Sequence, residues 1–492
     1  MALVPLSFPP GIFRAGTAYQ SKGRWYDCNL VRFFRNAILP WGGWRKKSTS
    51  TITGMGRAIM SWVTNDTATS WVAVGTESNL YAMSRSGVLS DITPAGFTAG
   101  RADAVAQGGF GSGAFGVGTY GSPRPDSSTI QRASMWSFDK WGERLLGVMG
   151  EDDGILVEWA LDTATPAAAV ANAPTCKAVL VTNENICMAL AASSIGRRVA
   201  WSDEADNTVW TASSTNQAGD IDLPTNGNIL QGMRVTGSNL ILTTLDAHTL
   251  TYAADTLVYS AKKVGDGCGG ISRNCGVALD GQAVWMGTGG FFVYNGYVSA
   301  LPCDVGDYVY SNLNITQSSK ITCQINSAYG EVMWKYPSAA STEVDSYVAY
   351  NYREKHWTIG TLARLSGFDR GATQYPLMVG SDGYVYEHEV ANAYSGMIPY
   401  LESGPLEIGN GDYVQYAQQM YADDLTVGDV TVTFKVKFFP DDAEVSFGPY
   451  ALTPRTDLRF CGRQIRVRFD GSATDSWRVG VPRIDIEQGG MR

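Results

Sequence analysis

The residues best suited to acid–base, nucleophilic or metal chemistry are few in this sequence. The three histidines are His248, His356 and His388, and the chain contains neither a GxSxG nor an HExxH motif. A histidine needs a nucleophile or further ligands at suitable spacing before it can act in catalysis or bind a metal. The sequence therefore predicts no catalytic, metal-binding or cofactor-binding residue, and we expect no enzymatic activity.

Paired carboxylates are the next candidates for chemistry. A glycoside hydrolase needs two carboxyl groups that face each other across a cleft, about 5–9.5 Å apart. Adjacent acids in turns are more typical of solvated loops than of such a cleft, and we favour that interpretation here. The adjacent aspartates of this chain are Asp152-Asp153, Asp423-Asp424 and Asp441-Asp442.

A glycine-rich segment from Gly108 to Gly121 contains a literal GxGxxG at Gly111, Gly113 and Gly116. A dinucleotide site needs this motif between a strand and a helix, with an acid about 20 residues further on. No helical pattern follows, and prolines come shortly after the segment. The sequence instead predicts a long glycine–aromatic loop that contacts another subunit.

Two further patterns could bind metal ions. Asp220 and Asp222 alternate in the polar segment from Asn216 to Gly227, as calcium ligands do, but the pattern lacks a third ligand and a terminal Glu. The eight cysteines form no CxxC pair, which argues against zinc. We expect a polar loop at the two aspartates and mostly reduced, buried thiols. The cysteines are residues 28, 176, 187, 268, 275, 303, 323 and 461.

A repeated strand–turn–strand motif forms the framework that must position the candidate residues described above. Its clearest copy is Ala283 to Tyr294, AVWMGTGGFFVY, in which glycines permit a sharp reversal between two apolar and aromatic runs. Where the copies lie closest, they recur at about 42 residues, near the period of a four-stranded propeller blade. The other copies are Val72–Tyr81, Leu146–Glu158, Val199–Trp210, Leu240–Tyr252, Glu331–Tyr350 and Leu377–Tyr386.

Hairpins of this kind cannot bury both faces of their sheets unless the sheets stack. Radial stacking in a β-propeller achieves this and leaves only short edges. We therefore predict an all-β fold with a propeller of six to eight blades, and an ordinary β-sandwich with many hairpins remains the alternative. The composition agrees with extensive β packing, since 492 residues include 55 glycines, 11% aromatic residues and only 17% charged residues.

The chain divides into three predicted regions. Residues 1–53 form an amino-terminal arm that we expect to dock as a strand pair on another domain and to share the carboxy-terminal platform. Residues 54–393 form the propeller, with a glycine-rich insertion near 96–132. Residues 394–492 form a small β-sandwich, because apolar and polar residues alternate along its strands. The alternation predicts that Val430, Val432, Phe434, Val436 and Phe438 face the core.

Charge and hydropathy limit the partners. The net charge is −9, from 47 acids against 38 bases, which argues against tight binding to nucleic acid through phosphates. It remains compatible with DNA that slides past an acidic wall. A basic stripe at Arg463, Arg466 and Arg468 is expected to pair with acids across the sheet. Met1 to Phe13 lacks the pattern of a signal peptide, and no apolar run is long enough to span a membrane.

Several of these phrases, taken in order, resemble the tail nozzle proteins of short-tailed bacteriophages, which are also called tail hub or tail stabilisation proteins. Each phrase alone is weak, and the ordered set covers most of the chain. The phrases are Gly23-Arg24-Trp25, Leu30-Val31-Arg32-Phe33, Trp41-Gly42-Gly43-Trp44, Gly108–Gly121, Trp141-Gly142-Glu143, Asn216–Gly227, Gly265–Ser272, Trp285–Gly296 and Gly462-Arg463-Gln464.

The resemblance implies a structural virion protein, assembled in the host cytoplasm, that forms a hexameric ring in the viral tail below the portal and adaptor rings. Tail fibres or spikes would attach to its flank, and genomic DNA would pass through its lumen without sequence-specific binding. The alternative is a propeller that binds or hydrolyses host-surface glycans. A sialidase-like repeat, Ser-x-Asp-x-Gly-x-x-Trp, would support that alternative, and only Ser381-Asp382-Gly383 approximates it.

Overall fold

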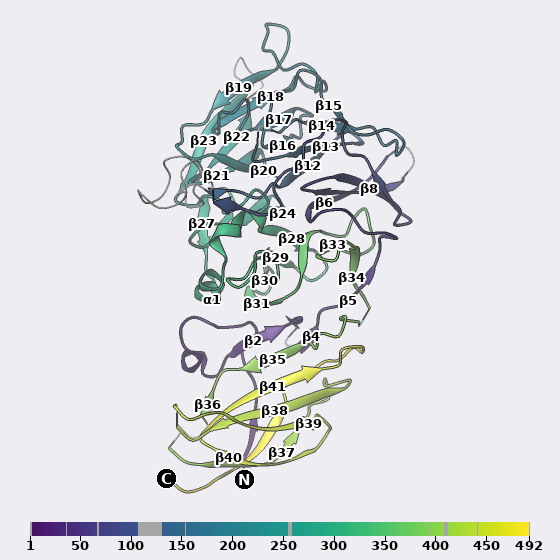
Figure 1. The fold of residues 1–492 in the computed structure, drawn as a ribbon. Coiled ribbons are helices and arrows are strands. Elements are labelled where there is room, and N and C mark those ends of the chain that lie inside the picture. Colours follow the sequence, from purple (N-terminus) through teal and green to yellow (C-terminus); the bar gives the residue numbers. More distant parts are fainter. Residues whose placement is uncertain are drawn as a thin grey trace, which may run out of the picture.

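The computed structural model describes residues 2–35, 37–65, 68–106, 130–152, 154–253, 258–391, 393–407, 412–439 and 441–491. Within these ranges the protein is built almost entirely of antiparallel β-strands, arranged as a large upper body and a smaller lower body (Figure 1). Both chain termini lie in the smaller body. No helix in the described part of the chain is long and apolar enough to span a bilayer.

The larger body consists of seven four-stranded sheets, which are the blades of a β-propeller. Each of the first three blades follows the chain in order. Blade 1 is β6 (Gly56–Val63), β7 (Ser70–Thr76), β8 (Leu80–Ser84) and β9 (Leu89–Asp91); blade 2 is β12 (Trp136–Trp141), β13 (Arg144–Met149), β14 (Val157–Trp159) and β15 (Ala168–Ala169); blade 3 is β16 (Ala178–Val181), β17 (Cys187–Leu190), β18 (Arg198–Trp201) and β19 (Gly219–Asp222).

The remaining four blades complete the ring, and the last one takes a strand from the amino-terminal region. Blade 4 is β20 (Ile229–Val235), β21 (Ser238–Thr243), β22 (Asp246–Tyr252) and β23 (Tyr259–Asp266); blade 5 is β24 (Gly276–Leu279), β25 (Gln282–Met286), β26 (Phe291–Tyr294) and β27 (Val298–Leu301); blade 6 is β28 (Thr322–Asn326), β29 (Glu331–Tyr336), β30 (Ser346–Asn351) and β31 (His356–Thr361); blade 7 is β32 (Arg364–Phe368), β33 (Leu377–Gly380), β34 (Val385–Ala391) and β5 (Gly43–Lys46).

The first strand of every blade faces the propeller axis. These strands contact one another in a closed circle, in the order β6, β12, β16, β20, β24, β28, β32 and back to β6. The prediction of an all-β propeller with six to eight blades is therefore confirmed, with seven blades. The repeated hairpins are the two middle strands of the blades, as β25 and β26 illustrate for Ala283–Tyr294.

One predicted hairpin is wrong. Val199–Trp210 was expected to contain both strands of a pair, but β18 pairs instead with β19, which begins only at Gly219. The intervening residues form turns, in which the Trp210 Nε1 group donates to the Asn207 carbonyl at 2.7 Å. This tryptophan thus belongs to a compact loop, and its ring packs against the apolar core formed by blades 2 and 3.

The smaller body, here called the platform, is a two-layered β-sandwich. One sheet has the order β1-β42-β37-β40, and the other has the order β2-β35-β41-β38-β39 with β36 paired to β41. Their bounds are β1 (Ala2–Pro5), β42 (Arg483–Gln488), β37 (Gln415–Tyr421), β40 (Thr456–Gly462), β2 (Trp25–Asn29), β35 (Tyr400–Ser403), β41 (Gln464–Gly471), β38 (Val430–Lys437), β39 (Val445–Ala451) and β36 (Leu406–Glu407).

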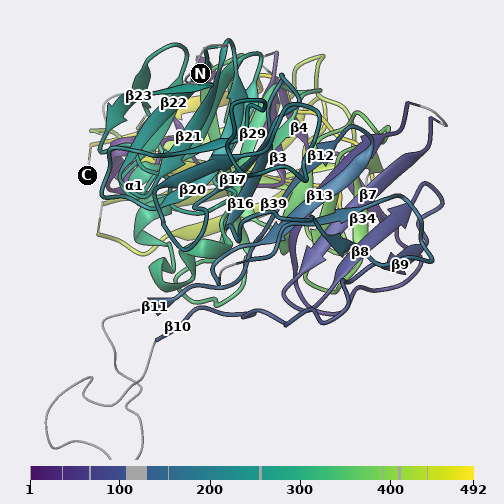
Figure 2. The same ribbon diagram turned by 90° about the horizontal axis from the view of Figure 1, so that it is seen from above.

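Short elements connect these sheets. Two of them, β10 and β11, form a ribbon that projects away from the propeller when the molecule is viewed from above (Figure 2). The short elements are β3 (Val31–Phe34), β4 (Ala37–Pro40), β10 (Val105–Ala106), β11 (Ile130–Gln131), the helix α1 (Gly306–Ser311) and the 3-10 helices η1 (Ala18–Ser21) and η2 (Ile315–Lys320).

The amino-terminal arm contributes to both bodies. Strands β1 and β2 pair with β42 and β35 of the platform. Residues 43–46, which the sequence placed in the arm outside the propeller, form β5 and pair with β34 of blade 7. The predicted boundary at residue 54 therefore falls too late in the chain. Strand β5 covers the outer edge of the last blade, whose backbone groups would otherwise lack partners.

The strand alternation predicted for the platform is nearly correct. Val430, Val432, Phe434 and Val436 of β38 are buried, and the residues between them are partly exposed. Phe438 is 43% exposed, because β38 ends at Lys437 and the chain then leaves the sheet. One apolar core continues from blades 4 to 6 through the arm into the platform, so the two bodies share buried surface.

Candidate functional site

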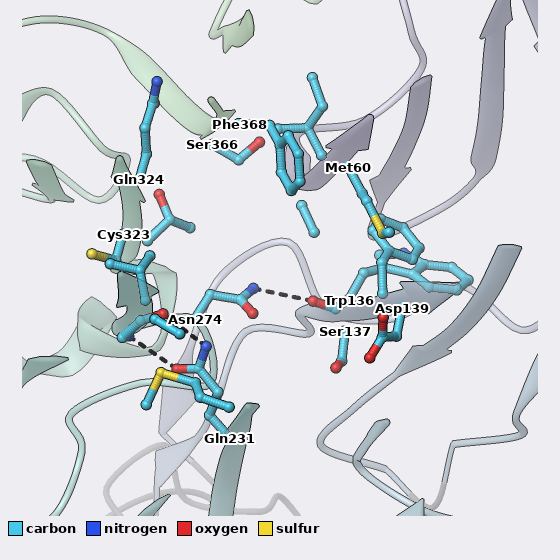
Figure 3. Close-up of a pocket in the computed structure, with 18 of the residues that line it drawn as sticks. Met60, Trp136, Ser137, Asp139, Gln231, Asn274, Cys323, Gln324, Ser366 and Phe368 are labelled. Carbon is cyan, nitrogen blue, oxygen red and sulfur yellow. Dashed lines mark hydrogen bonds between the residues drawn. The ribbon is translucent and has the colours of Figure 1, made fainter. Parts of the chain in front are cut away.

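The candidate site is a cavity of about 430 Å³ on the propeller axis (Figure 3). Residues of all seven innermost strands line it, so every blade contributes to its wall. Its lining combines aromatic rings, such as Trp136, Phe138 and Phe368, with amide side chains, such as Gln231 and Gln324. A concave site with a few polar groups among apolar ones is typical of small-ligand binding.

A segment that crosses the axis closes one end of this cavity. Asn274 precedes blade 5, and its Nδ2 donates to the carbonyl oxygen of Trp136 in blade 2 at 3.1 Å (Figure 3). The neighbouring Arg273 is buried, and its Nε donates to the Glu151 carboxylate beside blade 2 at 2.6 Å. Blades 2 and 5 lie on opposite sides of the ring, so these bonds span the axis.

Most polar groups in the cavity wall bind one blade to another. The Gln231 amide of blade 4 exchanges two 2.9 Å hydrogen bonds with the backbone of Gly276 in blade 5. The Ser366 hydroxyl of blade 7 donates to the Gly56 carbonyl of blade 1 at 3.0 Å. Such bonds satisfy buried polar groups and fix the ring of strands. The wall is thus largely occupied by contacts that stabilise the propeller.

Asp139 is the most connected carboxylate of the cavity. It is buried on blade 2, accepts the backbone N–H of Val181 in blade 3 at 2.8 Å, and forms an ion pair with Arg234 of blade 4 at 2.8 Å. A second carboxylate, Asp369 at the end of blade 7, accepts the backbone N–H of Ser327 at 3.2 Å. Both acids are therefore held as hydrogen-bond acceptors between blades.

The adjacent acids singled out in the sequence lie apart and bind local partners. Asp152 forms an ion pair with Arg101 at 2.6 Å. Asp423 accepts the backbone N–H of Val481 at 2.8 Å, and Asp442 accepts a backbone N–H within its own turn. These contacts fix loops, and among the described members of the three pairs each of these acids binds a partner in its own part of the fold.

The three histidines are buried in different blades. His248 lies 3.2 Å from Asp246 in blade 4, His356 packs edge-on against Phe33 at 5.5 Å, and His388 lies in blade 7. Burial lowers the pKa of His356, and it lowers the pKa of His388 well below the usual value, because a charged ring would lose its solvation there. The histidines therefore form no common site.

The aspartates and cysteines that the sequence analysis considered as metal ligands have other roles. Asp220 and Asp222 both form ion pairs with Arg198, at 3.3 and 2.7 Å, so they pair across a strand edge rather than converge on a cation. No group of three His, Cys, Asp or Glu residues in the described ranges could hold a metal ion. All eight cysteines carry free thiols, and five of them are buried.

The basic stripe of the platform pairs with acids, as predicted, at two of its three positions. The buried Glu402 carboxylate binds Arg466, Arg468 at 3.6 Å and Lys435 at 2.7 Å. Arg463 lies over the ring of Phe439, with 5.1 Å from its guanidinium carbon to the ring centroid. The stripe therefore stabilises the sheet and leaves little free positive charge for phosphates.

Two sequence features fall outside the described residues. One is the GxGxxG at Gly111, Gly113 and Gly116, together with the rest of the predicted subunit-contact loop, Gly108–Gly121, all of which falls within the undescribed residues 107–129. The other is Asp153, one of the adjacent acids. The predictions attached to them stay predictions.

A charged cluster that the sequence analysis did not identify borders the cavity between blades 6 and 7. Lys335 and Arg364 are both buried, and His388 accepts a hydrogen bond from the Arg364 Nε at 3.1 Å. The Lys335 Nζ donates to Oε1 of Gln324, whose side chain belongs to the cavity wall, at 2.5 Å. The only sequence signal was a lysine within the otherwise apolar MWKY strand.

The chain was compared with family models, curated proteins and solved structures. No family model and no curated protein matches the chain. Among solved structures, it is similar to an exo-beta-1,3-galactanase from Phanerochaete chrysosporium, with TM-score 0.32 and 10% identity over 91% of this chain and 100% of that chain. A virginiamycin B lyase from Staphylococcus aureus has TM-score 0.33 and 7% identity, over 56% and 93% of the two chains.

A gluconolactonase from Xanthomonas campestris has TM-score 0.32 and 8% identity, over 74% of this chain and 98% of its own. These similar structures are enzymes, so the expectation that this chain is not an enzyme is contradicted, and we do not retain it. At such identities and TM-scores the likeness assigns no reaction to this chain. The propeller assignment follows from the sheets of this structure itself.

Proposed function

We propose that this protein is a structural virion component, the tail nozzle of a short-tailed bacteriophage. The observation that carries the proposal is the pairing of a propeller with a smaller β platform, joined through one shared core. The resemblance to nozzle proteins implies a subunit of this kind, with a β-propeller and a smaller β platform. The subunit would reside in the viral tail after assembly in the host cytoplasm.

The closed propeller axis supports a ring of several subunits as the conduit. Asn274 and Arg273 bind blade 5 to the blade 2 side across the axis, so a DNA duplex has no path through a single propeller. A lumen must then be enclosed by neighbouring copies. The resemblance implies six copies below the portal and adaptor rings, with tail fibres or spikes on the flank.

Rigidity and charge suit a conduit for DNA under pressure. Buried Arg32 on the arm binds Glu331 of blade 6 and Glu389 of blade 7, which fixes the arm against the propeller. The net charge of −9 disfavours adhesion of phosphates to the wall. Genomic DNA would therefore pass without sequence-specific binding.

The experiment that tests this proposal is a quantitative protein inventory of purified virus particles from the source culture. We expect about six copies per particle, retained on tails after DNA release, as the hexameric ring requires. Electron microscopy of emptied particles labelled against the platform would locate the protein at the tail. Absence of the chain from particles, with free protein in the lysate, would contradict the proposal.

A second candidate is a propeller that binds or hydrolyses host-surface glycans. The observation that favours it is the axial cavity, which combines aromatic rings with the carboxylates of Asp139 and Asp369. Aromatic faces and carboxylates are groups that bind sugars and can catalyse their hydrolysis. Glycan binding and release of reducing ends, both lost in Asp139→Asn and Asp369→Asn, would support this function over the first.

A further inference from the structure

Two buried cations in the seam between blades 6 and 7 have no carboxylate partner. Lys335 of β29 has a side chain with no exposed surface, and Arg364 of β32 is 8% exposed. Neither forms an ion pair within 4 Å in the described part of the chain, whereas buried charges in proteins are normally paired. The two glutamates of the same seam, Glu331 and Glu389, are bound to Arg32.

The orientation of Gln324 leaves an unpaired donor beside Lys335. An ammonium group can only donate hydrogen bonds, so the Gln324 amide must turn its oxygen, Oε1, toward the Lys335 Nζ, which lies 2.5 Å away. The Nε2 end of the same amide then has no hydrogen-bond partner, although Gln324 is only 2% exposed. A buried donor without an acceptor is unfavourable, because it has lost its hydrogen bonds to water. The seam therefore contains one unpaired amide donor next to one unneutralised amine.

The amide of Gln324 lies at the wall of the axial cavity, and the Lys335 amine contacts that amide. Gln324 and Gly367 line the cavity, and Figure 3 shows Gln324 among its lining side chains. A Cβ atom at Gly367 would lie 1.8 Å from the Gln324 Oε1 and 2.6 Å from the Lys335 Nζ, so the lack of a side chain at this cavity-lining position makes room for both groups. A rotation of that amide would connect the amine with the cavity.

The seam contains more buried positive than negative charge, although the Asp382 carboxylate partly offsets the effect of burial on the pKa of Arg364. Burial lowers the pKa of Lys335 to about 7, the nearby Cys323 opposes this shift, and Arg364 adds to it. Burial also lowers the pKa of Arg364 to about 10 and that of His388 well below its usual value. Without an anion the amine loses its proton near neutral pH. An anion in contact with it would restore the charged form.

We propose that the seam between blades 6 and 7 binds a small oxyanion, a carboxylate or phosphate group, that enters from the axial cavity and contacts Gln324 and Lys335. The anion accepts hydrogen bonds from the Gln324 Nε2 and from the Lys335 Nζ, and its charge neutralises the cations of the seam. Binding is coupled to the uptake of one proton by Lys335. The site is independent of both functions proposed above.

The test is titration calorimetry of the full-length protein with sodium acetate and with sodium phosphate, at constant ionic strength in chloride. We expect saturable binding that is at least tenfold weaker at pH 8.5 than at pH 6, because the amine must be charged to bind. Repeating the titration in buffers with different ionisation enthalpies should show uptake of about one proton near pH 8. Acetate and phosphate, compared at one pH, distinguish the two oxyanions.

Three variants make the test specific. Lys335→Met should lose the binding and the proton uptake, whereas Lys140→Met, at an exposed position of β12, should retain both. Gln324→Glu places a carboxylate beside Lys335, so it should raise the melting temperature without added anion and abolish binding. Binding that persists in Lys335→Met, that lacks pH dependence, or that is absent from the folded wild-type protein would overturn the proposal.

Discussion

Two buried charge clusters in the same seam of the propeller are built in opposite ways. The first surrounds Arg32, whose guanidinium donates to both oxygens of Glu331 at 3.0 Å and to Glu389 at 2.5 and 3.0 Å. The guanidinium also stacks over Tyr329, 3.6 Å from the ring centroid. Burial alone would lower the pKa of Arg32, but the two carboxylates outweigh it and raise the pKa overall.

The second cluster contains Lys335 and Arg364, which have no carboxylate partner among the described residues. Glu331 and Lys335 lie on the same strand, four positions apart. Side chains alternate along a strand, so the two point to the same face. One strand therefore presents an acid to the arm at one end and a base to blade 7 at the other. Of the two clusters, only the one around Arg32 and Glu331 contains both positive and negative charges among the described residues.

This difference indicates separate roles for the two clusters. The Arg32 cluster joins three segments of the chain, and its directional bonds fix the arm in one position on blades 6 and 7. A buried ion pair contributes specificity of this kind more reliably than net stability. Within the described residues the Lys335 cluster contains no carboxylate, so its two cations are free to contact the anion that we propose.

The largest expected effect follows removal of the central cation. Arg32→Met would leave Glu331 and Glu389 buried without a cation, and we expect the free energy of unfolding to fall by about 3–5 kcal/mol. Urea unfolding monitored by tryptophan fluorescence would measure this loss. Arg35→Met is the matched control, because Arg35 is exposed and follows directly after β3, the strand that contains Arg32. This substitution should change stability by less than about 0.5 kcal/mol.

Substitution of Lys335 should have the opposite sign. The pKa of Lys335 is about 7 in the folded protein, compared with the ordinary value of 10.5 in the unfolded chain. The unfolded state therefore binds the proton more tightly. The lysine therefore destabilises the fold fully below pH 7, progressively less between pH 7 and 10.5, and not at higher pH. Each pKa unit corresponds to about 1.4 kcal/mol, so Lys335→Met should stabilise by about 2–4 kcal/mol at pH 7.

Thermal unfolding at pH 7, 8.5 and 10 would check this pH dependence. The advantage of Lys335→Met over the wild-type protein should shrink at each step as the folded and unfolded proteins come to the same protonation state. The matched control is Lys140→Met, for which no pH dependence is expected. A constant difference between Lys335→Met and wild type across this range would show that packing, and not charge, determines the effect.

The same comparison explains what the sequence could predict. Hairpin phrases such as Ala283–Tyr294 revealed the blades, because turn glycines and alternating apolar residues are local signals. Strand β5 was missed, because its partner β34 lies more than 300 residues away in the chain, and a four-residue strand has little periodicity of its own. Closure of a ring by distant segments is a tertiary event that local pattern does not encode.

The charged clusters were missed for a related reason. Arg32 stands in the motif Leu30-Val31-Arg32-Phe33, which gives no sign of its partners, because Glu331 and Glu389 come from two different blades. Lys335 stands among aromatic residues in MWKY, which signals a buried position, but the absence of an acid nearby depends on how the blades stack. The axial cavity likewise requires all seven blades before it exists.

A smaller effect is expected at His388, which tests the second cluster from the side of blade 7. Its pKa is held well below the usual 6.5 by burial and by Arg364 and Lys335, so the folded protein keeps the ring neutral. As the pH falls below 6.5, only the unfolded state gains this proton, and stability is lost. Wild type should therefore lose up to about 1.4 kcal/mol per pH unit more than His388→Gln, which retains an acceptor for Arg364.

Chemical unfolding of both proteins at pH 7, 6 and 5 would measure that difference. At pH 7 the two should differ by less than about 1 kcal/mol, since the glutamine oxygen can accept the Arg364 hydrogen bond. His356→Gln is a useful comparison, because burial lowers the pKa of that ring too, although less strongly. Parallel pH profiles for wild type and His388→Gln would contradict the view that the second cluster excludes a further charge.

The smallest effect is expected where an ion pair reaches solvent. Arg45 of β5 binds Glu387 at 2.8 Å, but its side chain is 62% exposed, and Lys47 binds the same carboxylate at 3.1 Å. An exposed pair contributes about 0–1 kcal/mol, and here a second cation remains, so Arg45→Gln should cost less than about 0.5 kcal/mol in urea unfolding. A loss as large as that of Arg32→Met would mean that burial does not separate the two kinds of pair, because both arginines bind glutamates of blade 7.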